Sequence, residues 1–297
     1  MARLLVLGDP VVSLGAETLI PDGGLVIEDA AIVAAGPREA RAALGPFERV
    51  LGSGGHFVVP GFVNCHYHSE LAMASNNPGS NLRLSTGICR VRDIMDAGGR
   101  VAFGTDGISF SDRDDFFTEL RLACYLQRLP REFGQGRLDS EQVLRAAAGN
   151  GARALGLAGR LGSLEPGRYA DLLIVRKDRI FFPPGRYDGE PFLDVVLDRA
   201  ESGDIDTVMA AGRVLMEGGR VTVVDEAQVR DRFAEAVADR VYRPSAEVRR
   251  WAELGARVEP YLPGFYRPWY ETPIEPAYVC NPRTPPAAPG RPPPPPP

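Results

Sequence analysis

Two histidines stand one residue apart in the segment VVPGFVNCHYHSELAM, residues 58–73. Because side chains alternate between the two faces of a β-strand, His66 and His68 would point to one side of an extended chain and Tyr67 to the other. Two imidazoles that converge in this way can bind a divalent metal ion, and imidazole suits Zn or Fe(II). Two surface histidines on a half-buried strand would have the same spacing, so the pair alone leaves both interpretations open.

Asp106 is the second candidate for a chemical role. It lies in RVAFGTDG, residues 100–107, just after a compact apolar run that predicts a buried strand. Parallel α/β folds place their catalytic groups at this end of a strand, although an aspartate there also commonly caps the next helix. Three aspartates stand closer to the start of that helix, namely Asp112, Asp114 and Asp115. Capping therefore does not require Asp106, and a functional role is favoured.

The elements that must position these residues alternate between strand and helix. We expect a strand over 59–75 that delivers the histidines. Helices are expected over 87–99, over 112–129 and from Asp139 or Ser140 onward, because their apolar residues recur at helical spacing. The apolar run described above supplies a second strand. Such alternation is typical of a parallel α/β sheet or barrel.

The two flanks of this region predict short strands separated by turns. Residues 1–58 contain β-prone runs, and GGLVIEDAAIVAAG predicts a hairpin with Glu28 and Asp29 near its turn. A second hairpin is expected over 206–224 with EGG as its turn, and a charged amphipathic helix over 225–241.

The composition is that of a soluble globular protein, with 44% apolar and 25% charged residues in 297. The net charge of −5 is spread along the chain, so we expect neither a nucleic-acid nor a membrane partner. The apolar run at the N-terminus meets Asp9 and Pro10 too early for a signal peptide. The four cysteines are widely spaced, which favours reduced thiols and a cytoplasmic protein.

Three stretches resemble the amidohydrolase superfamily. VVPGFVNCHYH resembles the motif of the first barrel strand, usually Pro-Gly-Phe-x-Asn-x-His-x-His. Residues 80–107, SNLRLSTGICRVRDIMDAGGRVAFGTDG, look like the seventh and eighth barrel units of the chlorohydrolase and nucleobase-deaminase branch. Residues 151–175, GARALGLAGRLGSLEPGRYADLLIV, are similar to the passage by which those enzymes leave the barrel and re-enter a β-sandwich. Together the resemblance covers about residues 1–225 in the family's order.

The resemblance implies a (β/α)8 barrel beside a small sandwich built from both chain ends. It implies one divalent metal ion, Zn first and Fe as the alternative, with His66 and His68 as ligands and Asp106 as ligand and proton acceptor. The implied reaction is hydrolytic deamination or dechlorination of an aminated or chlorinated heterocycle, in which a metal-activated water attacks the ring carbon. Many relatives are dimers, so a homodimer is the implied assembly.

The spacing departs from the family. A (β/α)8 barrel takes about 250 residues, roughly 30 for each strand–helix unit, yet His66 and Asp106 are only 40 positions apart. No histidine follows His68, so the two further histidine ligands and the acid that the resemblance implies are absent. The discontinuity falls between Glu70 and Asn77. A gene model that lacks a segment, a real internal deletion and a divergent non-catalytic relative all remain open.

These observations predict four regions. They are a composite β-sandwich over 1–58 and 159–224, a truncated barrel over 59–158 with about the first, seventh and eighth units, a helix with a Pro/aromatic extension over 225–284, and a disordered Pro-rich tail over 285–297. The predicted function is that of a metal-dependent amidohydrolase by descent, impaired by the missing ligands. The alternative is a non-catalytic fragment or partner-binding module, with the Pro-rich tail as a ligand for an SH3-like domain.

Overall fold

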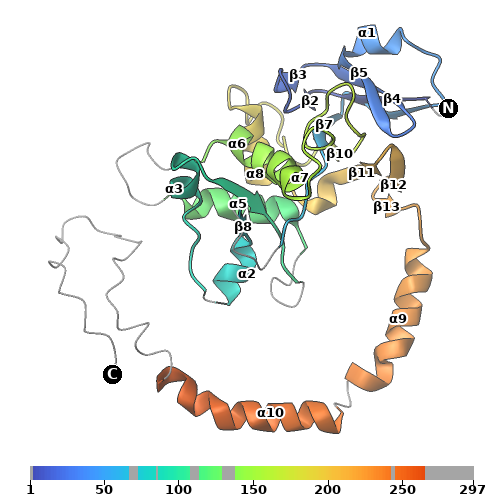
Figure 1. Ribbon diagram of the computed structural model, residues 1–297. Helices are drawn as coiled ribbons and strands as arrows, with labels where there is room; N and C mark the ends of the chain where they lie inside the picture. Colours follow the sequence, from blue (N-terminus) through green and yellow to red (C-terminus); the bar gives the residue numbers. More distant parts are fainter. Residues whose placement is uncertain are drawn as a thin grey trace, which may run out of the picture. The chain divides into compact units, whose positions relative to one another are not determined.

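The computed structural model describes residues 3–66, 73–84, 86–107, 114–128, 138–241 and 245–264. The chain divides into two compact units, one of Met1–Arg128 with Gly136–Phe233 and one of Leu129–Gln135 with Ala234–Pro297. The sheets and the candidate site belong to the first unit (Figure 1). In the described ranges, no helix is both long enough and apolar enough to span a membrane.

A four-stranded sheet forms the N-terminal part, with the strand order β5-β4-β1-β6. Its strands are β1 (Arg3–Gly8), β4 (Gly23–Glu28), β5 (Ala31–Pro37) and β6 (Arg49–Gly52), and the short helix α1 (Arg38–Ala42) follows β5. Strands β4 and β5 are antiparallel and are joined at Asp29, whose φ is 51°. The hairpin predicted at this position is therefore confirmed.

A seven-stranded sheet combines the two halves of the chain, with the order β13-β12-β11-β10-β7-β2-β3. The strands are β2 (Val11–Val12), β3 (Leu19–Ile20), β7 (His56–Pro60), β10 (Leu172–Arg176), β11 (Ile205–Ala210), β12 (Arg213–Glu217) and β13 (Arg220–Val221). Strand β10 lies antiparallel between β7 and β11. Strands that are more than 100 residues apart in sequence thus become neighbours.

The segment 206–224 corrects one prediction. It forms the three strands β11, β12 and β13 rather than a single hairpin. The EGG turn does join β12 to β13, but a second turn at Ala211 and Gly212 joins β11 to β12. Both of those residues have positive φ, 46° and 75°, as the tight turns of hairpins require. Glycine at position 212 has no Cβ, so the backbone adopts this positive φ without steric strain.

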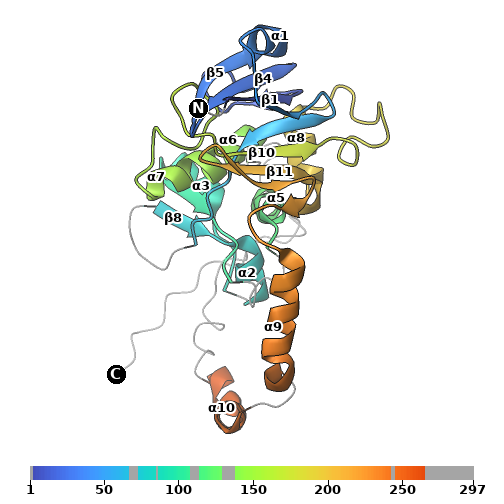
Figure 2. The same cartoon turned by 90° about the vertical axis from the view of Figure 1, so that its right-hand side faces the viewer.

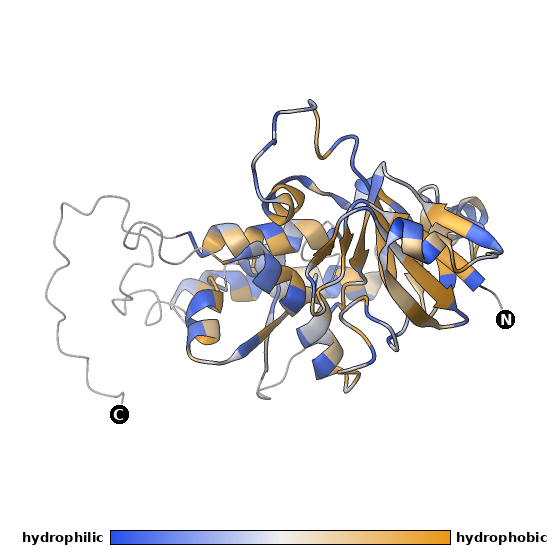
Figure 3. Cartoon of the chain, turned by 90° about the horizontal axis from the view of Figure 1, so that it is seen from above, coloured by the Kyte–Doolittle hydropathy of each residue, from blue (hydrophilic) through white to orange (hydrophobic). Residues whose placement is uncertain are grey.

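The central strands β7 and β10 of the seven-stranded sheet are buried on both faces, which explains their continuous apolar runs. Val58, Leu172 and Ile174 pack in one apolar cluster with the four-stranded sheet. Phe57, Val59, Leu173 and Val175, which alternate with them, pack in a second cluster with the helices and β9. Figure 2 shows the resulting layers, and Figure 3 shows strands that are mostly hydrophobic beside helices of mixed hydropathy.

A separate parallel pair, β8 (Met73–Asn76) and β9 (Arg100–Phe103), lies on the helical side. The helices α2 (Pro78–Arg83) and α3 (Val91–Asp96) connect the two strands, as a parallel pair requires. The predicted strand over 59–75 is wrong in extent, since β7 ends at Pro60 and β8 begins at Met73. Residues 61–66 are not a strand because their amides bond to different elements: Val63 N–H donates to Ala147 and Cys65 N–H to Phe103.

The other helices in the described part of the first unit are α5 (Phe116–Leu126), α6 (Ser140–Arg145), the π-helical turn η1 (Ala146–Asn150), α7 (Gly151–Ala154), α8 (Phe192–Arg199) and the 3₁₀ turn η2 (Ser202–Asp204). Asp115 caps α5 by accepting the Thr118 N–H at 3.2 Å, and Asp139 caps α6. Asp106 is therefore not needed as a cap of α5. Of the two candidate caps of α6, Asp139 and Ser140, the structure uses Asp139. Three further helices follow in the chain, α9 (Glu226–Val241), α10 (Ala246–Val258) and η3 (Glu259–Tyr261), of which only α9 was predicted.

Candidate metal centre

His66 reaches the centre through the backbone of residues 61–66. The Cys65 N–H donates to the Phe103 carbonyl at 2.8 Å, at the C-terminal end of β9. The side chain of Asn64 then exchanges two hydrogen bonds with Thr105, from Asn64 Nδ2 to Thr105 Oγ1 at 2.8 Å and from Thr105 N–H to Asn64 Oδ1 at 3.2 Å. These contacts hold His66 beside the loop that carries Asp106.

The structure brings two of the three predicted site residues together. His66 Nε2 lies 3.2 Å from Asp106 Oδ1. Their side chains are 27% and 13% exposed, so both are sheltered and still reachable from solvent. His68 and Tyr67 lie outside the described residues. The metal-binding role of all three predicted ligands stays a prediction.

The carboxylate of Asp106 is held from two sides. Ser80 Oγ–H donates to Oδ2 at 2.5 Å, and the Gly107 N–H donates to Oδ1 at 2.7 Å. Asp106 itself has a φ of 60°, a left-handed conformation that aspartate tolerates better than most residues. The backbone turn and the two donors together fix the direction in which the carboxylate points.

Asn77, the residue directly after β8, contacts the other side of the imidazole. Its Nδ2 lies 2.8 Å from His66 Nδ1, and the residue is only 7% exposed. The chain can approach this closely because residue 104 is glycine. A Cβ at Gly104 would lie 2.4 Å from Asn77 Oδ1 and 2.7 Å from the His66 backbone nitrogen, closer than van der Waals contact allows.

Glu119 is a buried carboxyl behind this cluster. It lies on α5 with 3% exposure, and its Oε2 accepts the Gly79 N–H of α2 at 2.8 Å. Burial raises the pKa of Glu119 above its ordinary value, and the negative charges of Asp115 and Asp106 add to this, against the opposing effect of the Gly79 hydrogen bond. The centre thus has a second acidic group close to Asp106.

Three residues of this cluster, Asn77, Ser80 and Glu119, were not predicted from the sequence. Asn77 and Ser80 follow a strand in the polar run NNPGSN, so the rule that selected Asp106 would also have selected them. Glu119 interrupts the apolar face of α5, which is unusual for a charged residue. No local signal indicates that Glu119 would bond to α2, because that contact joins residues 40 positions apart.

The described residues fit part of a metal site. Two ligand atoms of a tetrahedral ion with bonds of about 2.1 Å lie roughly 3.4 Å apart, close to the 3.2 Å between His66 Nε2 and Asp106 Oδ1. Within the part of the chain that the structure describes, no three His, Cys, Asp or Glu side chains gather closely enough to hold a metal ion. His66 and Asp106 can therefore supply two corners, and His68 is the candidate for a third.

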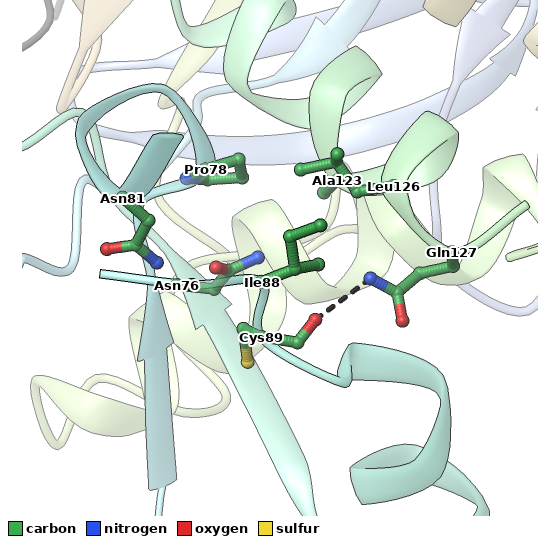
Figure 4. A pocket seen from close by; sticks show the side chains of 9 residues that line it. Asn76, Pro78, Asn81, Ile88, Cys89, Ala123, Leu126 and Gln127 are labelled. Atoms are coloured by element: carbon green, nitrogen blue, oxygen red, sulfur yellow. Dashed lines mark hydrogen bonds between the residues drawn. The ribbon is translucent and has the colours of Figure 1, made fainter. Parts of the chain in front are cut away.

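A depression is lined by residues of β8, α2 and α5 and of the segment 87–89 (Figure 4). Its lining includes Asn76, Ile88, Cys89 and Gln127, and Gln127 Nε2 donates to the Cys89 carbonyl at 2.9 Å. Burial raises the pKa of the Cys89 thiol, which disfavours the thiolate that a nucleophile or metal ligand needs. This depression contributes no chemical group to compare with His66 and Asp106.

Comparisons with known proteins place these residues in context. A sequence profile described as Amidohydrolase family matches residues 69–215, beginning directly after His68. A 5-methylthioadenosine/S-adenosylhomocysteine deaminase of Acetivibrio thermocellus is 34% identical over 168 residues, which are 57% of this chain and 38% of that protein. A 5'-deoxyadenosine deaminase of Methanothermobacter thermautotrophicus is 35% identical over 164 residues, 55% of this chain and 36% of its own.

The chain thus spans well under half the length of these curated relatives. The fold is also similar to a crystal structure of an adenosine deaminase from Xanthomonas campestris with bound Zn. That structure gives a TM-score of 0.70 at 16% identity, and the comparison covers 81% of this chain and 99% of that one. At this identity the likeness concerns the fold alone.

Proposed function

Because the chain belongs to the amidohydrolase family, we propose that His66, His68 and Asp106 hold one divalent metal ion, Zn or Fe, for the hydrolytic deamination of an aminated heterocycle. The observation that carries this proposal is the 3.2 Å contact between His66 Nε2 and Asp106 Oδ1 at the C-terminal end of β9. This contact brings together the histidine of the first motif and the aspartate of the second, although most of the family's sequence between the two motifs is missing from the chain.

Each residue of the cluster has a part in this proposal. Lewis-acid activation of a water molecule is the chemistry that the ion supplies when bound. Asp106 would accept the proton of the attacking water, since its carboxylate stands beside His66 and is aimed by Ser80 and Gly107. Asn77 holds the imidazole ring from the opposite side. The reaction consumes one water and releases the ring amino group as ammonia.

The proposed substrate class is a 6-aminopurine nucleoside. Both curated relatives described above are named as deaminases of adenosine-type compounds. A chlorinated heterocycle, from which water displaces chloride, is the alternative within the same chemistry.

We further propose that β8, β9 and residues 61–66 are the seventh, eighth and first units of a (β/α)8 barrel, beside a β-sandwich built from both chain ends. Strand β9 has partners on both edges: the Gly104 N–H donates to Asn76 at the end of β8, and the Phe103 carbonyl accepts from Cys65. Adjacent backbone groups of a strand point to opposite edges. The spatial order of first, eighth and seventh units is the one that barrel closure requires.

We also propose a cytoplasmic protein without nucleic-acid or membrane partners, which suits the interspersed charges. The homodimer is proposed from the resemblance to the family. Sedimentation of the purified chain measures its oligomeric state.

The test combines metal analysis with ammonia release. The purified 297-residue chain is loaded with Zn or Fe(II) and incubated with 5′-methylthioadenosine, S-adenosylhomocysteine, cytosine, guanine and a chlorinated triazine. Stoichiometric metal with ammonia release that is lost in His66→Ala and Asp106→Asn supports the proposal. A folded chain with neither metal nor turnover overturns it.

A second candidate function is that of a non-catalytic amidohydrolase-like fragment. It is favoured by the number of ligands, because no histidine follows His68 in the sequence. The start of the profile match at residue 69, directly after the histidine pair, supports a discontinuity there. Genomic DNA between the codons of Glu70 and Asn77 decides its origin. An open frame of about 150 codons there, five units of roughly 30 residues, would restore a complete enzyme.

A further inference from the structure

Helix α2 begins without a cap from its own N-cap residue. Within the described residues, the side chain of Asn77 does not bond to α2, and it contacts the imidazole of His66 instead. Pro78 at the next position has no N–H, so Gly79 carries the first N–H of the helix that needs an acceptor. Glu119 of α5 supplies this acceptor, because its Oε2 accepts the Gly79 N–H at 2.8 Å. A carboxylate from another helix thus takes the place of the missing cap.

The absence of a side chain at residue 79 allows α2 and α5 to meet in this way. A Cβ at Gly79 would lie 2.3 Å from Glu119 Oε1 and 3.2 Å from Glu119 Cδ. Glu119 is only 3% exposed, so its carboxyl depends on partners within the protein. A buried polar group that loses its partner costs more free energy than an ordinary hydrogen bond contributes. The contact between Gly79 and Glu119 therefore fixes the first turn of α2 against α5.

The next residue of α2 carries this restraint to Asp106. Ser80 is 1% exposed, and its Oγ–H donates to Asp106 Oδ2 at 2.5 Å. Because Ser80 directly follows Gly79, a shift of the first turn of α2 would move the hydroxyl relative to the carboxylate. Hydrogen bonds weaken steeply when their geometry departs from the ideal. The restraint that Ser80 places on Asp106 thus depends on how firmly α2 is held.

We propose that Glu119 is a positioning residue for Asp106, which anchors α2 through Gly79 so that the Ser80 hydroxyl meets the carboxylate. Where it concerns zinc, the inference rests on the proposed metal site. Glu119 acts from behind the centre and needs no contact with an ion or a substrate. The anchor requires its acceptor oxygen rather than its charge, because the Gly79 N–H needs only a lone pair.

The first experiment observes Asp106 in the metal-free protein by ¹H–¹⁵N spectroscopy. The Gly107 N–H donates to Asp106 Oδ1 at 2.7 Å, so the amide proton shift of Gly107 reports the position of the carboxylate. In Glu119→Leu, which has no acceptor, we expect the amide protons of Gly79 and Gly107 to move upfield as their hydrogen bonds weaken. In Glu119→Gln, which still offers a carbonyl oxygen, we expect both signals to keep their wild-type positions.

The second experiment measures zinc affinity by chelator competition. We expect Glu119→Leu to weaken zinc binding about tenfold, the lower end of the usual effect of losing an outer partner. Glu119→Gln is expected to retain the wild-type affinity. Because Ser80 is the link, adding Glu119→Leu to Ser80→Ala should cause no further loss, so the two effects are not additive. Should Glu119→Leu not fold, Gly79→Ala serves in its place, since the added Cβ displaces the same carboxyl.

Glu165→Leu is the control for loss of a carboxyl that is held in a similar way. A Cβ at Gly15 would lie 2.5 Å from Glu165 Oε1, and the same oxygen accepts the Ala16 N–H at 3.3 Å. Neither Gly15 nor Ala16 belongs to the centre. We expect Glu165→Leu to be less stable than the wild type and to leave the Gly107 signal and the zinc affinity unchanged. Circular dichroism checks that each variant is folded.

Three results would overturn the proposal while the metal site stands. One is a folded Glu119→Leu with wild-type zinc affinity and an unmoved Gly107 signal. Another is an affinity loss in Glu119→Leu that adds in full to that of Ser80→Ala, because the effect would then bypass Ser80. The third is an equal loss in Glu119→Gln, which would assign the effect to charge. Failure of the wild type to bind zinc would overturn the proposed function alone, since the Gly107 signal of the metal-free variants still tests whether Glu119 positions Asp106.

Discussion

At the scale of single residues, Asp106 is the residue of the centre whose position is restrained by several neighbours. Its backbone is left-handed, one carboxylate oxygen accepts from Ser80, and the other accepts from Gly107 and contacts His66. A carboxylate that is held by several neighbours needs no rearrangement in order to bind a metal ion. The orientation of this carboxylate is therefore a property of the fold.

Ser80→Ala tests how much of this orientation depends on one hydroxyl. Ser80 is 1% exposed, and its removal leaves Asp106 Oδ2 without that donor. We expect the free energy of unfolding to fall by about 1 kcal/mol and zinc affinity to fall roughly tenfold. Ser163→Ala is the matched control, because it deletes another buried hydroxyl that donates to a carboxylate, Glu165, at 2.6 Å. It should lower stability alike and leave zinc affinity unchanged; equal affinity losses in both variants would contradict the prediction.

Glu119→Gln tests the buried carboxyl through the pH dependence of stability. Because burial raises the pKa of Glu119 in the folded state above its ordinary value, the folded state keeps a proton that the unfolded state has lost. The free energy of unfolding therefore falls as pH rises through this window and stays lowered above it. Glutamine has no such titration and can still accept the Gly79 N–H.

The measurement is denaturant unfolding of both proteins from pH 4 to pH 8. We expect the advantage of Glu119→Gln over the wild type to grow as pH rises from about 4.5. Carboxyls with lowered pKa, such as those of Asp9 and Glu165, are present in both proteins and cancel in the difference. A difference that does not change with pH would refute the assignment.

At the scale of elements, the turn η1 and helix α7 press against the segment that carries His66. A Cβ at Gly151, the first residue of α7, would lie 2.5 Å from Val63 Cβ and 2.9 Å from the Val63 carbonyl oxygen. Asn150 Nδ2 also donates to the Val101 carbonyl of β9 at 2.8 Å. The position of residues 61–66 thus depends on a close helix contact that only glycine permits.

Gly151→Ala is expected to destabilise the fold by about 1–3 kcal/mol because the added methyl group collides with Val63 backbone and side chain. Gly149→Ala, two residues earlier in η1, is the control, since a Cβ there meets no described atom within 4 Å. Helix propensity alone predicts a gain of up to about 1 kcal/mol for the control. Chemical denaturation distinguishes the two, and a Gly151→Ala protein as stable as the control would contradict the contact.

The elements also show what the sequence could and could not predict. Local signals, a few residues from the structure they cause, predicted the helix α9 and narrowed the caps to a few residues. Asp115 was one of three aspartates placed near the start of its helix, and Asp139 was one of two candidate caps. The extent of the strand over 59–75 was wrong because the amides of residues 61–66 bond to η1 and β9, about 80 and 40 positions away. His66 and Asp106 were found by motif, whereas the role of Asn77 appears only once β8 and β9 are paired.

At the scale of the whole molecule, the seven-stranded sheet needs both ends of the chain. Its β7 comes from the first 60 residues and its β10–β13 from residues 172–221, and each face is covered by a different apolar cluster. The two ends are also joined where two turns meet. The Ala170 N–H donates to Ala30 at 2.8 Å, and the Gly212 N–H donates to Ala170 at 3.1 Å. Loss of this junction should loosen the scaffold that holds the centre.

Gly212→Ala tests this junction, and Gly219→Ala is the control because both glycines have nearly the same φ. Gly212 and Gly219 have φ values of 75° and 73°, so alanine imposes a similar left-handed strain of roughly 1–2 kcal/mol at either position. A Cβ at Gly212 would lie 1.7 Å from the Asp29 carbonyl oxygen, whereas one at Gly219 meets no described atom within 4 Å. We therefore expect Gly212→Ala to lower the free energy of unfolding by at least about 2 kcal/mol more than Gly219→Ala. Hydrogen exchange should show the extra loss of protection in β4, β5 and β10 together, because the clash separates the two chain ends. Equal losses of stability in the two variants would mean that the turn at Gly212 makes no stabilising contact with the turn at Asp29.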